Sequence, residues 1–149
     1  MPTMRKPILQ ALGALALAAA LTIGVPAGAA VKLPSTQVAW VPAAAPADID
    51  RAFAAARAAN KPLLLYWGAT WCPPCNQLKA TLFNRADFIE RARSFVAVHI
   101  DGDLPGAQQL GSRFKVRGYP TMILMTADGT EITRLPGEVD APQVLNVLQ

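Results

Sequence analysis

Two cysteines three positions apart, shortly after a strictly apolar run, constrain this chain more than any other feature. Cys72 and Cys75 are the only cysteines among the 149 residues. The preceding run, residues 63–67, holds only leucine, tyrosine and tryptophan, which is typical of a strand buried on both faces. Pro73 and Pro74 follow the first cysteine, and proline is well tolerated in the first turn of a helix. The pattern predicts a buried strand, a turn, and a helix that opens at Cys72.

Residues 1–29 have the organisation of a secretory signal peptide. Two positive charges lie near the start, residues 8–25 hold no charge, and small residues follow. We expect cleavage after Ala29 or Ala30. An uncleaved membrane anchor is the alternative, because an apolar stretch of 18 residues is just long enough to span a bilayer. Either arrangement places the rest of the chain in the periplasm, where the two thiols meet oxidising conditions.

The composition favours one small folded domain after this leader. Hydrophobic residues make up 52% of the chain, too many for a disordered protein. The net charge is +4 and no basic run exceeds two residues, so we expect no nucleic-acid partner. Residues 30–47 are rich in alanine and proline and are predicted to be a tether, with Gln37–Val41 a possible short edge strand. The domain is expected over residues 48–149, as a monomer.

Strand and helix patterns alternate along residues 48–149. Alternation of this kind predicts an α/β fold, with a central mixed sheet and helices on both faces. Asp48 is expected to cap the first helix, and Asp128-Gly129 predicts a tight hairpin between the last two strands. Besides the strand and helix around the cysteines, helices are expected at residues 48–59, 87–94, 107–114 and 140–148, and strands at residues 95–100, 121–126 and 130–135.

The cysteine pair carries the predicted chemistry. A sulfur at a helix N-terminus meets unpaired N–H groups and the positive end of the helix dipole, which stabilise a thiolate. We therefore predict that Cys72 is the exposed nucleophile and Cys75 the buried resolving thiol of a redox-active disulfide. Because Pro73 and Pro74 lack N–H groups, the backbone and the thiol of Cys75 are the main donors left for Cys72. We expect the Cys72 pKa to be lowered only moderately.

Other uses of the pair fit less well. A zinc site needs further ligands, but the chain has no third cysteine and His99 is its only histidine. Attachment of c-type haem needs a histidine after Cys75, where Asn76 stands. We therefore expect no metal and no cofactor. A purely structural disulfide remains possible, although so short a loop constrains the unfolded chain little.

Several motifs together resemble the thioredoxin superfamily. Residues 71–75, with a tryptophan before the cysteines, and residues 118–121, a glycine, tyrosine, proline and threonine, carry the resemblance. Residues 61–71 are similar to secreted thioredoxin-like proteins related to the C-terminal domain of DsbD-type reductases. The resemblance implies a thioredoxin-like fold in which the Tyr119–Pro120 bond is cis and faces the sulfurs.

The same resemblance implies the residues that bind the substrate. Trp71 would shield the sulfurs and contact the partner, and the backbone of Tyr119 beside Pro120 would pair with an extended substrate segment. Gly137 falls where the family has a glycine beside the active-site groove.

The chain departs from the family at two positions behind the second cysteine. Tyr66 stands where thioredoxins usually carry a buried acid, and Ala97 stands where they carry a lysine. Deprotonation of Cys75 would then need another base, for which Asp101 and Glu90 are candidates. His99 is expected to be a hydrogen-bonded structural histidine on a strand.

The sequence thus predicts an enzyme, a periplasmic thiol:disulfide oxidoreductase that reduces or isomerises protein disulfides. Its expected partners are protein disulfide substrates and a membrane electron donor of the DsbD type. One alternative is a DsbA-like oxidase with the same residues and the opposite redox poise. Another is a binding module, in which the pair holds Cu(I) or the domain docks a partner with an idle disulfide.

Overall fold

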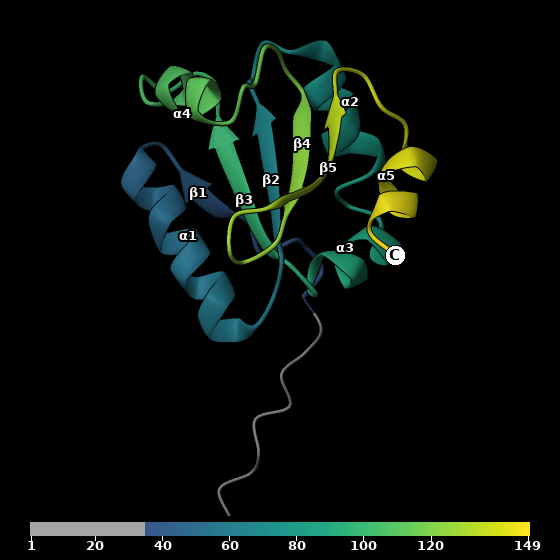
Figure 1. Cartoon of the computed structure of the whole chain (residues 1–149). Coiled ribbons are helices and arrows are strands. Elements are labelled where there is room, and N and C mark those ends of the chain that lie inside the picture. The colour runs from purple at the N-terminus through teal and green to yellow at the C-terminus, as the bar shows by residue number, and fades with distance from the viewer. Residues whose placement is uncertain (1–34) are drawn as a thin grey trace, which may run out of the picture. The chain divides into compact units, whose positions relative to one another are not determined.

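The computed structural model describes residues 35–149, so the predicted signal peptide and the first part of the tether lie outside the described residues. These residues form five strands and five helices (Figure 1). In chain order they are β1 (Val41–Ala43), α1 (Pro46–Ala59), β2 (Leu63–Gly68), α2 (Pro73–Thr81), α3 (Ala86–Ala92), β3 (Val96–Asp101), α4 (Ala107–Arg113), β4 (Thr121–Met125), β5 (Glu131–Pro136) and α5 (Ala141–Val147).

The strands form one mixed sheet in the order β1-β3-β2-β4-β5. β2 pairs in parallel with β3 and antiparallel with β4, so it lies at the centre, and all six of its residues are buried. β4 and β5 form the predicted antiparallel hairpin, whose turn contains Gly129 with a φ of 96°. The predicted α/β architecture with a mixed sheet is confirmed.

Successive side chains of a strand point to opposite faces of the sheet, and each face packs into its own hydrophobic core. Leu63, Leu65 and Trp67 of β2 pack under α1 and α4, whereas Leu64 and Tyr66 pack under α2, α3 and α5. Figure 1 shows these two groups of helices on opposite sides of the sheet. The apolar run of β2 has this composition because each of its faces is covered by helices.

Two local predictions at the start of the domain are wrong. The edge strand lies at Val41–Ala43 and pairs with β3, rather than at Gln37–Val41. Val38 and Trp40 instead pack against the hydrophobic core beneath α2, α3 and α5, although neither residue belongs to a strand. The first helix begins at Pro46 with Ala45 as its N-cap.

Asp48 therefore lies within the first turn of α1 and not at its cap. Its carboxylate accepts hydrogen bonds from the backbone N–H groups of Ala44 and Ala45, both at 2.8 Å. These bonds lower the pKa of Asp48 and satisfy the N–H groups of the N-cap residue and of the residue before it. Within residues 35–149 there is no helix with the length and apolarity needed to cross a membrane.

Candidate active site

The two cysteines form a disulfide at the start of α2. The S–S bond joins Cys72, the N-cap residue, to Cys75, and their Cα atoms lie 5.3 Å apart. The backbone N–H of Cys75 donates to Sγ of Cys72 at 3.2 Å. Cys72 has extended backbone angles, as expected for a residue before proline. The chain after β2 therefore places one sulfur at the helix N-terminus and brings the second one turn along.

Both sulfurs are covered in this oxidised state, which corrects the prediction that Cys72 is exposed. Cys72 is 2% exposed and Cys75 is fully buried. They form a small cluster with Ala69, and the partly buried ring of Tyr119 packs against it. The neighbouring Tyr119 ring therefore covers the disulfide.

The loop before β4 has the geometry that the resemblance implies. The Tyr119–Pro120 bond is cis. Gly137, with a φ of 77°, donates its N–H to the carbonyl of Pro120 at 2.8 Å and so joins the end of β5 to this loop. A left-handed backbone angle of this kind favours glycine. The predicted groove residue is thus hydrogen-bonded to the cis-proline loop.

Tyr119, which packs against the disulfide, and Trp71, which precedes Cys72, form a pair that we call the front cover. Trp71 is 67% exposed, and its ring centroid lies 6.2 Å from that of Tyr119. The Tyr119 ring lies directly over Gly102, because a Cβ added there would be 2.3 Å from a ring carbon. Burial raises the pKa of Tyr119, and nearby Asp103 adds to this shift. The front cover therefore combines one exposed ring with one half-buried ring.

Asp103 is a site residue that the sequence did not single out. Its carboxylate accepts from the Thr70 backbone N–H at 2.9 Å and from the Thr70 hydroxyl at 2.8 Å. The backbone bond is the main reason that the pKa of Asp103 is lowered. These bonds tie the loop before Cys72 to the loop after β3. Nothing in the sequence at 101–103 signals a partner 33 positions away.

Tyr66, one of the two residues that depart from the family pattern, lies on the face of the sheet beneath α2, α3 and α5. Tyr66 is 1% exposed, its hydroxyl has no hydrogen-bond partner, and burial raises its pKa to about 12. His99 on β3 is directly opposite and stacks on it at 5.1 Å. The expectation of a hydrogen-bonded histidine is wrong, because Nε2 of His99 is buried without a partner. Burial lowers the pKa of His99.

The two candidate bases lie in different surroundings. Glu90 lies on the exposed surface of α3, where it forms an ion pair with Arg93. It is therefore not a base for the buried Cys75, which corrects that candidate. Asp101 ends β3 opposite Gly68 and accepts from the N–H of Asp103 at 3.0 Å. Ala97 is buried opposite Leu64 and contributes no charge.

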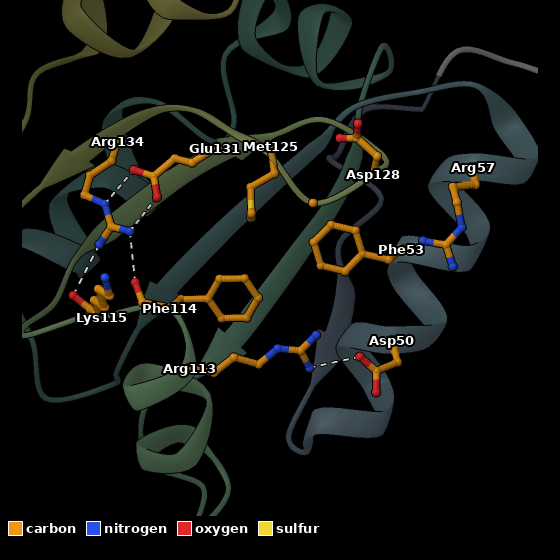
Figure 2. Close-up of a pocket in the computed structure, with 11 residues that line it drawn as sticks. Asp50, Phe53, Arg57, Arg113, Phe114, Lys115, Met125, Asp128, Glu131 and Arg134 are labelled. Atoms are coloured by element: carbon orange, nitrogen blue, oxygen red, sulfur yellow. Dashed lines mark hydrogen bonds and ion pairs between the residues drawn. The ribbon is translucent and has the colours of Figure 1, made fainter.

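One cavity lies away from the disulfide. It has a volume of about 600 Å³ and lies where α1, α4 and the β4–β5 hairpin meet (Figure 2). Phe53, Phe114 and Met125 line it, and Figure 2 shows charged side chains around them. Arg113 pairs with Asp50 at 2.9 Å, which neutralises one of those charges. None of the predicted site residues lines this cavity. Residues 35–149 also contain no group of three or more histidine, cysteine or acidic side chains placed to hold a metal.

Comparison with known proteins identifies a family, several proteins of similar sequence and solved structures of similar fold. The sequence model of the thioredoxin-like domain matches residues 49–149. The thiol:disulfide interchange protein DsbD of Pseudomonas fluorescens is 35% identical over 100 residues, which cover 64% of this chain and 17% of that protein. DsbD 2 of Pseudomonas aeruginosa is 32% identical over 111 residues, or 72% of this chain and 19% of that protein. The chain therefore spans less than a fifth of the length of these relatives.

A solved structure shares the fold. The oxidised C-terminal domain of DsbD from Neisseria meningitidis has a TM-score of 0.59 and 23% identity, covering 68% of this chain and 90% of that domain. The family model, the matching sequences and the sheet order agree with one another. The chain belongs to the thioredoxin-like family, and its sequence relatives are thiol:disulfide interchange proteins of the DsbD type.

Proposed function

We propose that this protein is a periplasmic thiol:disulfide oxidoreductase that reduces or isomerises protein disulfides through Cys72 and Cys75. One observation carries the proposal. The two sulfurs form a disulfide at the N-terminus of α2, and the Cys75 N–H points at the sulfur of Cys72. The same donor can stabilise a thiolate on Cys72 once the disulfide is reduced.

The exchange proceeds in two balanced steps. The Cys72 thiolate attacks a client disulfide, forming one S–S bond to the client while the client's other sulfur leaves as a thiolate and takes a proton. The Cys75 thiolate then attacks Cys72, which restores the disulfide and releases the second client sulfur. The client gains two electrons and the protein loses two. Cys75 gives up its proton before the second step, because a thiol is a poor nucleophile.

The front cover is where we place the client. Trp71 offers an exposed apolar surface, and the backbone of Tyr119 next to Pro120 can pair with an extended client segment. Because Cys72 is 2% exposed, the Tyr119 ring must move aside when the client or the electron donor docks. Trp71, Tyr119 and Pro120 are therefore proposed as the substrate-binding residues.

The electron supply follows from the compartment. Residues 1–29 are proposed to be a cleaved signal peptide, so the domain works where thiols tend to be oxidised. A reductase there needs a donor that returns two electrons per cycle. The named relatives are thiol:disulfide interchange proteins of the DsbD type, which supports a membrane donor of that type.

A disulfide-exchange assay tests the proposal directly. The domain should accelerate reduction of insulin by dithiothreitol, and Cys72→Ser should abolish the acceleration. Cys75→Ser should retain the attacking sulfur and accumulate a mixed disulfide with its client, which mass spectrometry detects. Unchanged turnover in Cys72→Ser would contradict the proposal and leave only a binding role for the domain.

Equilibration with glutathione buffers tests the direction of transfer. A reductase or isomerase should have a potential of about −200 mV or lower, whereas a DsbA-like oxidase lies near about −120 mV. Pro73 and Pro74 give the Cys72 thiolate no N–H donor, so we expect the lower range. A value near the oxidase end would overturn the reductase assignment but leave the exchange chemistry intact.

A further inference from the structure

A second cavity lies on the α2, α3 and α5 side of the sheet. Its volume is about 310 Å³, at the lower end for small-molecule sites. Its walls include the side chains of Trp40, Tyr66, Lys79, Phe83 and His99. We call it the back pocket. It shares no residue with the disulfide or the front cover, and its properties are independent of the proposed function.

The aromatic side chains of the back pocket form one continuous cluster. The ring centroid of Phe83 lies 5.2 Å from that of Trp40 and 4.9 Å from that of Tyr66. Trp40 and Tyr66 are 5.6 Å apart, and His99 stacks on Tyr66. Surfaces of this kind favour a planar apolar group, which can stack on the rings or meet their edges.

Two polar atoms among these rings have no hydrogen-bond partner. Only three buried side-chain polar atoms in residues 35–149 are unpaired, and two of them are the Tyr66 hydroxyl and His99 Nε2. Buried polar groups nearly always have partners, because an unpaired one loses its bonds to water without replacement. A phenol hydroxyl can donate one bond, and Nε2 of a neutral imidazole donates one in the tautomer that carries its proton on Nε2. Together they offer two donors that the protein itself does not use.

The charge at the back pocket is positive. Lys79 of α2 is the charged residue that lines it, and no carboxylate in residues 35–149 lies within ion-pair distance of the Lys79 ammonium. The other charged or titratable groups facing His99 are the Asp101 carboxylate on its own strand and Tyr66 on β2. Burial keeps His99 neutral near pH 7, so the pocket offers one ammonium and two neutral donors.

We propose that the back pocket binds a small aromatic carboxylate. The ring of the ligand packs on Trp40 and Phe83. Both polar atoms are closed to solvent in this structure, so small shifts of the surrounding rings let the carboxylate accept hydrogen bonds from the Tyr66 hydroxyl and His99 Nε2–H and pair with the Lys79 ammonium. This arrangement satisfies both unpaired polar atoms and the unpaired cation with a single ligand group.

Titration of the full domain with benzoate, followed by NMR, tests the proposal. We expect saturable shifts of the Trp40 indole N–H and the His99 ring signals. Tyr66→Phe removes one donor and leaves the ring, so it should weaken binding about tenfold. Lys79→Gln should weaken binding about threefold and reduce its dependence on salt. Neither measurement depends on disulfide exchange, so failure here leaves the proposed function untouched.

Matched controls separate this site from general effects. Tyr119→Phe removes the other tyrosine hydroxyl, and Lys115→Gln removes a lysine outside the back pocket; both should leave benzoate affinity unchanged. Benzyl alcohol, which keeps the ring but carries no charge, should bind more weakly than benzoate. The proposal is overturned if wild-type protein gives no saturable shift, or if Tyr66→Phe binds benzoate as tightly as wild type. Equal binding of the alcohol overturns the choice of an anion.

Discussion

Two tyrosines lie over two neighbouring glycines next to the disulfide, and they differ in how much freedom they have. Tyr66 covers Gly68 on the back side, and Tyr119 covers Gly102 on the front. The glycines are themselves joined, because the N–H of Gly102 donates to the carbonyl of Gly68 at 2.7 Å. Tyr66 is 1% exposed and enclosed by other rings, whereas Tyr119 is only partly buried.

The difference between the two tyrosine rings suggests that one side of the site governs the stability of the fold and the other governs access to the disulfide. A fully enclosed ring cannot yield without disturbing the core, because protein interiors are closely packed. A ring with one free side can swing outward at little cost. We therefore expect the back side of the site to set stability and its pH dependence, and the front side to set the rate at which the disulfide is reached.

Gly68→Ala should have the largest effect. The added Cβ would lie 2.2 Å from the hydroxyl of Tyr66, so the Tyr66 ring must shift against the rings of Phe83 and His99 that pack on it. We expect a loss of about 3 kcal/mol in the free energy of unfolding, the upper end for overpacking. Urea denaturation measures it. If Gly68→Ala lowered the free energy of unfolding no more than Gly102→Ala does, Tyr66 and Tyr119 would not differ in their freedom to move.

Alkaline pH should act mainly through Tyr66. Burial raises its pKa from 10.0 to about 12, so the folded state keeps a proton that the unfolded state releases. That contribution is complete below pH 10 and is lost as the pH rises toward about 12, with a total of about 2 kcal/mol. Denaturation at a series of pH values checks this. Tyr66→Phe should make stability nearly independent of pH over this range. If stability fell as steeply in that variant, a group other than Tyr66 would be responsible.

Mild acid should act through His99, the only histidine. Burial lowers its pKa below 6.5, so the unfolded state takes up a proton before the folded state does. Stability therefore falls as the pH drops below 6.5. His99→Gln should remove most of this slope. A wild-type curve that is flat below pH 6.5 would show that His99 titrates normally.

Gly102→Ala should have the smallest effect on stability and a visible effect on reactivity. Its Cβ would lie 2.3 Å from the Tyr119 ring, which can turn outward. We expect a cost below about 0.5 kcal/mol, as for surface substitutions, and a several-fold faster reduction of the disulfide by dithiothreitol. Tyr119→Ala should give the same acceleration, and the double variant no more than either single one. Unchanged reduction rates would show that Tyr119 does not limit access.

Much of the architecture was predictable because it depends on local patterns. The apolar run at residues 63–67 and the Asp128-Gly129 turn correspond to β2 and to the hairpin of β4 and β5. The start of α2 followed from Pro73 and Pro74. The edge strand was misplaced because three residues at a sheet edge carry almost no periodic signal.

The site was predictable only in part. The cysteine spacing and the motif at residues 118–121 indicated which residues meet, and the disulfide and the cis Tyr119–Pro120 bond agree with them. The burial of Cys72, the bond from Thr70 to Asp103 and the unpaired nitrogen of His99 were not foreseen. Each depends on residues far apart in the chain.

The sequence by itself determined the order of strands and helices and the spacing of the two sulfurs, because hydrophobic periodicity and proline geometry act over a few neighbouring residues. Only the tertiary structure decided which groups cover those sulfurs and which polar atoms are left unpaired. Burial and hydrogen-bond partners are properties of packed surfaces: packing sets Tyr66 of β2 against His99 of β3 and brings Tyr119 from the loop before β4 over Gly102.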